Sequence, residues 1–416
     1  MTFRGTGRCL AVWSSTSPMH ERVRFVADVE RGELTMDELC ERYDVSRKTG
    51  YKWLGRYREH GPAGLQDQSR RPHHSPNATD PVVVALLEEL RRLHPTWGAE
   101  KLLKVLGRRE PRLELPARST GCELLKRAGL VRQKRRSVRR GHPGPPLSVM
   151  DEPNAVWCAD FKGQFKTRDG IYCYPLTVTD GFSRYLLGCQ ALRSTRHELA
   201  KPVFARLFQE FGLPRIIRTD NGVPFASTAL GRLSHLSVWW IRLGVQPELT
   251  EPASPAQNGR HERMHKTLKA ETARPPAGSL SAQQVRFNAF RREFDDERPH
   301  EALGQETPVS VYERSPRQFP RTLPAISYPG HYEIRYVSEN GAIRWKRAWV
   351  GVTTVLAHEY IGLEEAGDGL WDVYFSHLRL GRLDERRMQI EDPYGRWTRW
   401  DPLPMSPDRS VTHVPD

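Results

Sequence analysis

The stretch Arg218–Phe225 places an acidic residue between a short strand pattern and a tight turn. Pro214–Arg218 has the β-branched composition of a strand, and Asn221-Gly222 forces the backbone to turn. Asp220 is therefore expected where a buried strand ends, with its carboxylate directed out of the sheet edge. Because ligands and metal ions collect at such strand ends in α/β sheets, Asp220 is a candidate metal ligand.

Length and composition limit the classes of protein open to this chain. With 416 residues and 38% hydrophobic content, it can form two to four domains with real cores. No apolar run approaches the roughly 18 residues of a membrane span, and Met1–Pro18 has no apolar secretory segment. Met19 directly precedes the first helical pattern, and our hypothesis is that it is the true start. The six cysteines are scattered without a Cys-x-x-Cys pair, which favours a reducing cytosol over a zinc ribbon or a disulfide framework.

Positive charge is concentrated in the first part of the sequence. Residues 1–150 hold 29 Lys and Arg against 17 Asp and Glu, which is +12 of the formal net charge of +14. A basic front part on a near-neutral remainder is typical of a polyanion-binding arm on a catalytic or structural body. A solvated basic surface is the alternative.

Residues 19–65 have the pattern of a helix-turn-helix domain. Helices are predicted over Glu21–Glu30, which Gly32 closes, over Thr35–Tyr43, and from a Ser46 cap to about Glu59. Three short helices with a tight turn before a basic third helix match helix-turn-helix geometry, with a plain three-helix bundle as the alternative. The third helix is expected to turn Trp53, Leu54 and Tyr57 to the core and to leave Arg47, Lys48 and Lys52 for DNA.

The same pattern repeats over residues 80–130, after a linker at 66–79. Helices are predicted over Pro81–Leu93, from Ala99 to Leu106, and from a Ser119 cap to Ala128, with Gly129 at the C′ position. Two such units in series would bind a longer DNA site than one. The expected DNA contacts of this second unit are Arg118, Ser119, Thr120 and Lys126.

A basic linker follows at residues 131–152, where a run of cations precedes several Gly and Pro residues. We expect it to follow DNA phosphates, with a plain spacer as the alternative. Its expected phosphate contacts are Arg132, Lys134, Arg135, Arg136, Arg139 and Arg140.

Residues 153–312 alternate strands and helices. Three strands come first, then an amphipathic helix, the strand before Asp220, a further helix, a short strand and a helix that contains Glu262. Three antiparallel strands followed by alternating helices and parallel strands is the order of a ribonuclease-H-like α/β domain. The predicted elements are Ala155–Phe161, Ile171–Thr179, Tyr185–Ala191, His197–Phe211, Arg215–Thr219, Ser227–Leu243, Val245–Leu249 and Gln257–Thr272.

Short motifs in this region are Trp157-x-x-Asp160, Thr219–Gly222, Asn258–Arg263 with Lys266–Lys269, and downstream Arg298–Gly304 with Thr307-Pro308. The first three resemble the catalytic core shared by retroviral integrases and bacterial insertion-sequence transposases. The downstream motif resembles the tail of the insertion-sequence members. Retroviral integrases begin with a His/Cys zinc module that this sequence lacks, so the resemblance points to the bacterial transposases.

The resemblance implies that Asp160, Asp220 and Glu262 are the catalytic, metal-binding triad. The chemistry asks for the same arrangement, because in-line cleavage of a phosphodiester needs both the attacking and the leaving oxygen stabilised, and two divalent ions do this. Hard oxygen ligands suit Mg²⁺, with Mn²⁺ as a substitute. Asp180 and Glu251 are alternative acidic ligands. Asp180 is expected at a hairpin turn, and Glu251 is expected to be solvated before a Pro-rich loop.

Glu262 is preferred because Lys266 and Lys269 follow it at helical spacing, so one face offers an acid for metal and cations for phosphates. A surface ion-pair stripe is the alternative. The spacing departs from the resemblance, since 41 residues separate Asp220 from Glu262 where the mid-thirties are typical. The surplus is expected in Ser227–Leu243, and its role is open. Asn258 is a weaker candidate DNA contact.

The last part of the sequence is expected to pack one more helix, Leu280–Glu297, through Val285, Phe287, Phe290 and Phe294. Five short strands then suggest a small SH3-like β-barrel over residues 325–383, with hairpin turns at Asn340-Gly341 and Asp368-Gly369. Residues 384–416 lack periodicity and are predicted to be a partly disordered tail. The predicted strands are Glu333–Val337, Ala342–Trp349, Tyr360–Leu363, Leu370–Phe375 and Leu378–Leu380.

Together these patterns predict a transposase that binds the ends of its element, hydrolyses one strand and joins the exposed 3′-hydroxyl to target DNA. Its partner is double-stranded DNA, and the resemblance implies a homo-multimer on paired ends in the bacterial cytoplasm, at the nucleoid. Two alternatives stay open: a non-catalytic helix-turn-helix regulator, and a structure-specific nuclease on the same core.

Overall fold

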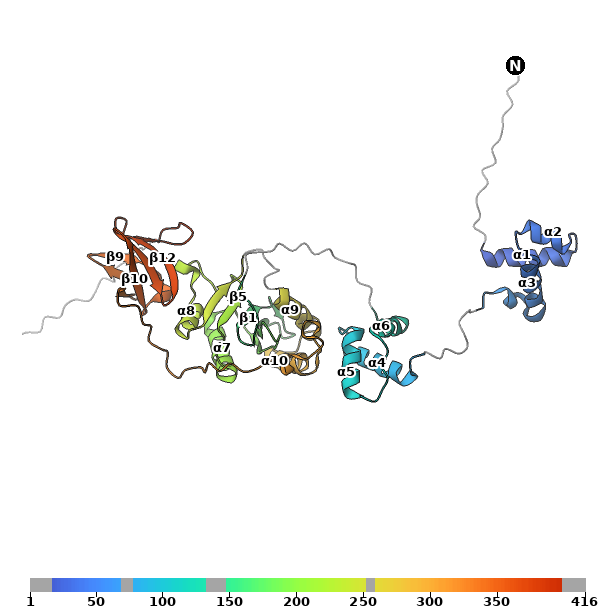
Figure 1. Ribbon diagram of the computed structural model, residues 1–416, viewed down its shortest axis with the longest axis horizontal. Coiled ribbons are helices and arrows are strands. Elements are labelled where there is room, and N and C mark those ends of the chain that lie inside the picture. The colour runs from blue at the N-terminus through green and yellow to red at the C-terminus, as the bar shows by residue number, and fades with distance from the viewer. Residues whose placement is uncertain (1–16, 69–77, 132–146, 252–258, 399–416) are drawn as a thin grey trace, which may run out of the picture. The chain divides into compact units, whose positions relative to one another are not determined.

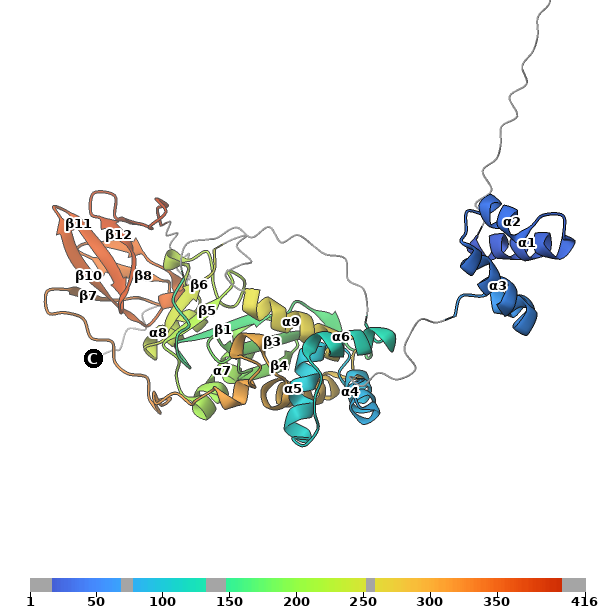
Figure 2. The ribbon, with the colours of Figure 1, turned by 45° about the vertical axis from the view of Figure 1, so that its right-hand side comes forward.

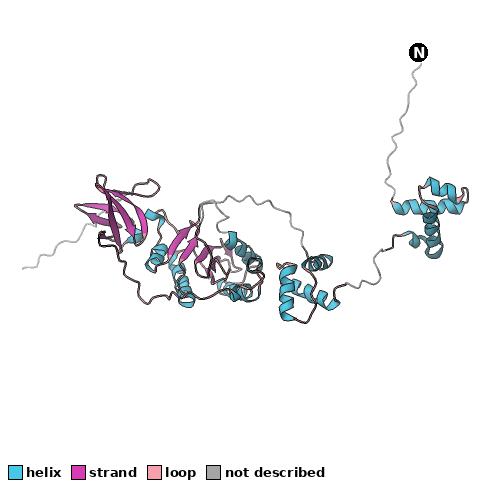
Figure 3. Cartoon of the chain, in the orientation of Figure 1, coloured by secondary structure: helices cyan, strands magenta, loops and turns pink. Residues whose placement is uncertain are grey.

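The computed structural model describes residues 17–68, 78–131, 147–251 and 259–398 (Figure 1). The chain divides into two compact units, Met1–Ala78 and Thr79–Asp416. The described parts of residues 17–131 are helical, whereas the described residues from 333 onward are mostly strands (Figure 3). No described helix is long and apolar enough to cross a membrane.

The first unit is a bundle of three short helices, which confirms the helices expected there. Ser17, Thr35 and Ser46 cap the three helices, and Thr35 forms a reciprocal capping box with Glu38. Gly32 ends the first helix in the left-handed conformation. The helices are α1 (Pro18–Arg31), α2 (Met36–Arg42) and α3 (Arg47–His60), followed by a 3₁₀ turn at Gly61–Leu65. Their core consists of Phe25, Val26, Leu39, Cys40, Leu54 and Leu65.

The second unit begins with another three-helix bundle, built on an amphipathic α4 that buries Val83, Leu87 and Leu90. The third helix starts earlier than expected: its N-cap is Ala117, and Ser119 lies inside the first turn, where it makes no cap. Gly129 follows the last helix with a φ of 69°, as predicted. The helices are α4 (Pro81–Leu93), α5 (Ala99–Arg109) and α6 (Arg118–Arg127).

A six-stranded mixed sheet forms the centre of the second unit. The order is β2-β3-β1-β5-β6, with β4 paired to β3; β1 and β3 are antiparallel, whereas β1, β5 and β6 are parallel. This is the expected order, with the additional short strand β2. The strands are β1 (Val156–Phe161), β2 (Phe165–Lys166), β3 (Tyr172–Asp180), β4 (Gly188–Leu192), β5 (Ile216–Thr219) and β6 (Gln246–Leu249).

Helices cover both faces of this sheet (Figure 2). On one face, α7 (His197–Phe211) and α8 (His235–Arg242) pack on Trp157 and Ile217. On the other, α9 (Gly259–Thr272) and α10 (Leu280–Arg292) enclose a smaller core with Cys173 and Cys189. The side chains of β1 alternate between these two environments, and this alternation decides which face Asp160 occupies.

One predicted helix is wrong in part, and the end of another has π-helical geometry. Ser227–Leu243 is not one helix: a 3₁₀ turn at Leu230–Arg232 comes first, and a capping box of Ser234 and Ser237 then starts α8. The predicted Leu280–Glu297 helix continues beyond α10 as a π-helical turn, Glu293–Glu297. Phe287, Phe290 and Phe294 are buried as expected, but Val285 is 66% exposed and packs no core.

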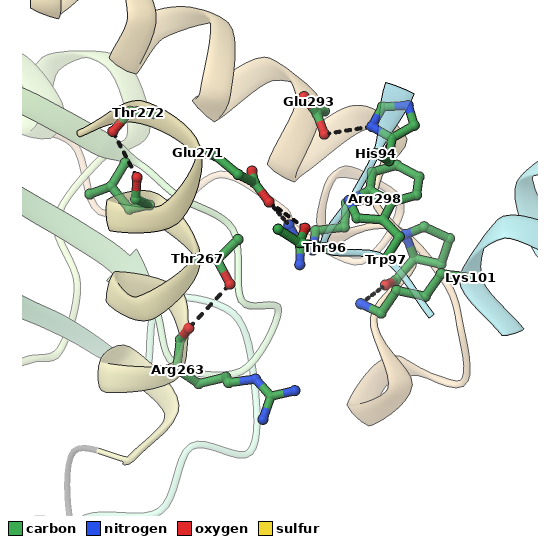
Figure 4. A network of polar contacts seen from close by, with 12 residues as sticks. His94, Thr96, Trp97, Lys101, Arg263, Thr267, Glu271, Thr272, Glu293 and Arg298 are labelled. Atoms are coloured by element: carbon green, nitrogen blue, oxygen red, sulfur yellow. Dashed lines mark hydrogen bonds and ion pairs between the residues drawn. The ribbon is translucent and has the colours of Figure 1, made fainter. Parts of the chain in front are cut away.

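The second three-helix bundle contacts the π-helical turn and the end of α9 (Figure 4). His94 Nδ1 lies 3.0 Å from Glu293 Oε1, and Thr96 donates a 2.5 Å hydrogen bond to Glu271 Oε1. The same Glu271 oxygen accepts a 3.2 Å hydrogen bond from Arg298, whose guanidinium lies over Trp97. One carboxylate at the end of α9 therefore joins the bundle to the core domain.

The C-terminal strands form two antiparallel sheets, of order β13-β12-β11-β10-β7 and β8-β9. No ladder among the described residues closes them into one barrel, so the SH3-like barrel stays a prediction. The predicted strand Ala342–Trp349 is wrong, since the chain reverses at Lys346, with φ of 51°. The strands are β7 (Glu333–Tyr336), β8 (Ala342–Trp345), β9 (Ala348–Gly351), β10 (Tyr360–Gly367), β11 (Leu370–Phe375), β12 (Leu378–Asp384) and β13 (Gln389–Glu391).

The tail predicted after residue 384 is ordered in its described part, residues 384–398. Strand β13 pairs with β12 there, and Glu391 bridges to Trp397. Residues 399–416 lie outside the described residues.

The surplus residues between Asp220 and Glu262 hold the C-terminal domain against the core domain. A shared hydrophobic cluster joins them to the strands, and Arg242 forms a 2.7 Å ion pair with Glu359 on the C-terminal side. Their contribution to the cluster consists of Leu230, Leu233, Val238 and Ile241.

Candidate active site

Asp160 and Asp220 lie at the same end of two neighbouring parallel strands. The ladder between β1 and β5 pairs Ala159 with Thr219, and each acid is the next residue along its own strand. Adjacent strands lie about 4.8 Å apart, so both carboxylates lie at the same edge of the sheet, the one where the parallel strands end. Both side chains are half-buried. This edge is where the sequence predicted a metal site.

The turn after β5 fixes the second acid. Gly222 donates its backbone N–H to Asp220 Oδ1 at 3.0 Å, and a Cβ added at Gly222 would lie 3.2 Å from that oxygen. The Asn221 side chain donates a 2.6 Å hydrogen bond to the Thr250 carbonyl, which ties the turn to the end of β6. The Asn-Gly pair therefore orients the Asp220 carboxylate as well as reversing the chain.

Glu262 lies in the first turn of α9, with an exposed side chain. The residues on the inner side of that turn, His261 and His265, are buried against β3. His261 Nδ1 lies 2.9 Å from Thr179 Oγ1, and the Nε2 atoms of His261 and His265 lie 2.8 and 2.6 Å from Thr177 Oγ1. Since Thr177 pairs with Asp160 across the ladder between β3 and β1, these contacts bring the start of α9 beside the first acid.

The pKa of Asp160 responds to the charges of the other two acids of the predicted triad. Burial, the negative charge of Asp220 and, more weakly, that of Glu262 together raise the pKa of Asp160 to about 7, while Lys162 opposes them. The charges of Asp220 and Glu262 therefore disfavour the ionised form of Asp160, and a divalent cation would relieve that repulsion. Three hard oxygen donors around a shared negative field fit Mg²⁺.

A second grouping was missed by the sequence reasoning. Ligand atoms of Asp160, His261 and His265 all lie within 4.8 Å of one another, and His265 Nδ1 is 3.5 Å from Asp160 Oδ2. Burial lowers the pKa of both histidines, that of His261 to about 3, so both imidazoles are neutral. The available signal was a pair of histidines, His261 and His265, at i and i+4 in the helix that contains Glu262.

The rival acid Asp180 has a structural role. Its side chain is 1% exposed, and it accepts hydrogen bonds from the backbone N–H groups of Asn154 and Ser183 and from the Ser183 hydroxyl, at 2.6 to 2.8 Å. Burial nevertheless raises its pKa. A carboxylate occupied in this way closes the turn after β3 and leaves no oxygen edge open to a metal.

The predicted DNA contacts on α9 and on the helical bundles are exposed, but several are paired. Lys266 and Lys269 are exposed on α9, as is Lys48 on α3, while Lys52 lies over the Trp53 ring. Arg47 forms a bidentate ion pair with Asp37.

In the second bundle, Ser119 and Thr120 are exposed at the start of α6. Arg118 pairs with Glu100 at 3.2 Å, and Lys126 lies 3.6 Å from Glu123. The remaining predicted contacts, Arg132, Lys134, Arg135, Arg136, Arg139, Arg140 and Asn258, lie outside the described residues.

Family models match most of the chain in segments. An integrase core domain matches residues 150–255 and, in a second model, residues 243–308. A helix-turn-helix domain matches residues 21–73, and a homeodomain-like domain matches residues 49–125. The class of protein is therefore one with helix-turn-helix domains before an integrase core.

Among curated relatives, an uncharacterised 39.2 kDa protein of insertion element IS476 from Xanthomonas euvesicatoria is 28% identical over 256 residues, 59% of this chain and 69% of the relative. The Gag-Pol polyprotein of baboon endogenous virus is 29% identical over 155 residues, 37% of this chain and 9% of the polyprotein. The chain thus spans less than a tenth of that polyprotein. The family models and the insertion-element relative support an insertion-sequence transposase with an integrase-type core.

Solved structures show a low similarity to this chain. The simian T-cell lymphotropic virus intasome chain, in complex with PP2A regulatory subunit B56 gamma, has 16% identity and a TM-score of 0.34 over 70% of this chain and 97% of that one. The HTLV-2 integrase catalytic core in complex with magnesium has 15% identity and a TM-score of 0.32, over 40% and 100%. These scores are low, and the fold assignment rests on the sheet order and the family models.

Proposed function

We propose that this protein is a DDE transposase that binds the ends of its element, hydrolyses a DNA strand and transfers the 3′-hydroxyl to target DNA. The observation that supports it most directly is the position of Asp160 and Asp220, which follow a paired Ala159 and Thr219 on neighbouring parallel strands. Glu262 lies on the helix packed beside them and contributes to the field at Asp160. Three carboxylates in one field are the donor set that metal-dependent phosphoryl transfer requires.

Asp160, Asp220 and Glu262 would hold the divalent cations, Mg²⁺ or Mn²⁺. Bound there, two such ions would stabilise the attacking and leaving oxygens of the phosphodiester. In this proposal the hydrogen bond from Gly222 N–H orients the Asp220 carboxylate, and the buried inner side of α9 would hold Glu262 near the first acid. Lys266 and Lys269, exposed on the same helix, would bind phosphates on either side of the scissile bond.

The helical bundles would supply recognition of the element ends. In this proposal α3 and α6 are the recognition helices, Lys48 and Lys52 bind phosphates in the first unit, and Ser119 and Thr120 do so in the second. The basic linker and the SH3-like C-terminal strands would add phosphate contacts without reading sequence. A homo-multimer would pair two ends.

A strand-transfer assay tests the proposal. Full-length protein is incubated with labelled terminal-repeat DNA, a target plasmid and Mg²⁺, and cleaved and joined products are separated. Wild type should cleave and join, and Asp220→Asn should bind the repeat with unchanged affinity but lose at least about 100-fold in product. Joining by Asp220→Asn would refute the catalytic site, binding without cleavage by wild type would support a regulator, and cleavage without joining would support a nuclease.

A further inference from the structure

Five side chains form a continuous chain of polar contacts from β3 to the first acid. Thr179 Oγ1 lies 2.9 Å from His261 Nδ1, and His261 Nε2 lies 2.8 Å from Thr177 Oγ1. Thr177 Oγ1 lies 2.6 Å from His265 Nε2, and His265 Nδ1 faces Asp160 Oδ2 at 3.5 Å. Every group except Asp160 is nearly inaccessible to solvent, so its hydrogen bonds must be made inside the protein.

The protons available allow one complete ordering toward the acid. Each threonine hydroxyl has one proton, and each neutral imidazole has one N–H and one lone pair. If Thr179 donates to His261, then His261 donates from Nε2 to Thr177, Thr177 donates to His265 Nε2, and His265 is left with its proton on Nδ1. That proton points at Asp160. Every donor in the chain then has one acceptor.

The competing orderings are less favourable. Thr177 Oγ1 also lies 3.1 Å from the Asp160 carbonyl oxygen, a longer contact than the 2.6 Å to His265. If Thr177 donated to that carbonyl, both imidazoles would donate to Thr177 from Nε2. His265 would then turn a lone pair toward the Asp160 carboxylate, and the two would repel each other when Asp160 is the ionised ligand of a bound cation.

We propose that His265 is a positioning residue for the catalytic centre, which donates Nδ1–H to Asp160, and that Thr179, His261 and Thr177 fix its tautomer. The proposal rests on the proposed function in one respect, the assignment of Asp160 as a metal ligand. The 3.5 Å separation exceeds a hydrogen bond, and polar contacts of catalytic groups shorten in the complete complex.

Such a donor orients a ligand and tunes its basicity. Groups that hydrogen-bond a metal ligand typically contribute about 10- to 100-fold to metal affinity. In this chain the donor comes from the helix that also contains Glu262, so the orientation of the first acid and the position of the third depend on one contact. The two threonines and two histidines of this chain of contacts are not required by the Asp-Asp-Glu triad itself.

The first test measures metal binding without DNA or turnover. Full-length protein is titrated with Mn²⁺ alone, and free Mn²⁺ is followed by electron paramagnetic resonance. His265→Leu removes the donor and should weaken Mn²⁺ binding about 10- to 100-fold. His265→Asn is the matched control, because its amide nitrogen occupies the place of Nδ1 and still donates, so its affinity should stay within about 3-fold of wild type.

A variant far from the metal tests the ordered chain itself. Thr179→Val removes the first donor while every side chain near the metal is retained, and it should weaken Mn²⁺ binding in the same direction but less, whereas Thr179→Ser should not. Thermal unfolding and circular dichroism show that each variant is folded. Imidazole ¹⁵N shifts of selectively labelled wild type should give Nδ1–H for His265 and Nε2–H for His261.

Several outcomes would overturn the proposal. Wild-type Mn²⁺ affinity in folded His265→Leu would do so, as would an Nε2–H tautomer at His265. If His265→Asn lost binding as fully as His265→Leu and the wild type bound one Zn²⁺ tightly, the histidines would be ligands themselves. Failure of the proposed function looks different, since Asp220→Asn would then bind Mn²⁺ as wild type does.

Discussion

Arg218 on β5 and Glu248 on β6 lie opposite each other in the parallel ladder and form an ion pair, with Nε 2.6 Å from Oε2. Their side chains are 6% and 15% exposed. Ser148 joins them, because its N–H donates to Glu248 and its carbonyl accepts from Arg218, at 2.9 and 2.7 Å. Arg218 directly precedes Thr219 and Asp220, so the pair supports the strand end that presents the second acid.

Breaking this pair should destabilise the core domain strongly. Glu248→Ala leaves the Arg218 guanidinium buried without its partner, and we expect a loss of about 3–5 kcal/mol in the free energy of unfolding. Urea unfolding of the full-length protein, followed by tryptophan fluorescence, measures it. Glu88→Ala is the control, because the exposed Glu88–Arg92 pair on α4 should contribute less than about 0.5 kcal/mol. Equal effects of the two substitutions would contradict the prediction.

Asp295 should make stability fall as pH rises. Burial raises the pKa of Asp295 well above its usual 3.8, although the Leu186 N–H donates to it at 2.7 Å. The folded protein therefore holds a proton that the unfolded chain releases, so this contribution is complete below pH 3.8 and is lost as pH rises toward the folded pKa.

Asp295→Asn retains the oxygen that accepts from Leu186 and removes the titration. Its melting temperature should exceed that of wild type at pH 7, and the difference should shrink at pH 5. Asp296→Asn, at an exposed neighbour, should show no such trend. A difference independent of pH would indicate a packing effect.

The attachment of the second bundle to the core domain should depend on Glu271. Arg298 is 8% exposed, and Glu271→Ala would remove its ion-pair partner together with the acceptor of Thr96. We expect a loss of about 3–5 kcal/mol from the uncompensated cation. Hydrogen exchange should accelerate in α5 and in the last turn of α9. Glu297→Ala, which removes an exposed 3.5 Å pair with Arg109, should leave exchange unchanged.

Cations of the first bundle should contribute differently to DNA affinity according to whether they already form an ion pair within the protein. Lys48→Ala should reduce the slope of log affinity against log salt by about 1 and weaken binding to all sequences alike. Arg47→Ala should change the slope less, because Arg47 already pairs with Asp37. Fluorescence anisotropy with terminal-repeat and unrelated DNA at several salt concentrations measures both. A larger loss with Arg47→Ala would mean that DNA breaks the ion pair.

Local signals in the sequence predicted some elements closely. The Pro81–Leu93 and His197–Phe211 helices occur with the predicted bounds, because strong apolar periodicity coincides with caps or breakers at both ends. The strand-end positions of Asp160 and Asp220 also follow from short-range pattern, since each acid ends a β-branched or aromatic run. Prediction was good where neighbours in sequence decide the structure.

Several predictions failed because they depend on contacts between residues far apart in the sequence. Residues 227–234 fall in a predicted helix, but Leu230 and Leu233 pack on strands more than a hundred positions later, which periodicity cannot reveal. The hairpin at Lys346 has no Gly or Asn to announce it. His261 and His265 meet threonines about eighty positions earlier, so their buried role required the register of β3.

The cluster that joins the segment after Asp220 to the C-terminal strands bears on how the catalytic region can be handled in isolation. A fragment that ended near residue 320 would lack the C-terminal strands and would expose a hydrophobic patch to solvent. The patch would consist of Leu230, Leu233, Val238 and Ile241. We expect such a fragment to precipitate or self-associate even though its sheet is complete. Replacing Val238 and Ile241 with polar residues would then be a precondition for studying it in solution. The sequence boundary of the core domain therefore does not mark a surface that is stable in water without the C-terminal strands.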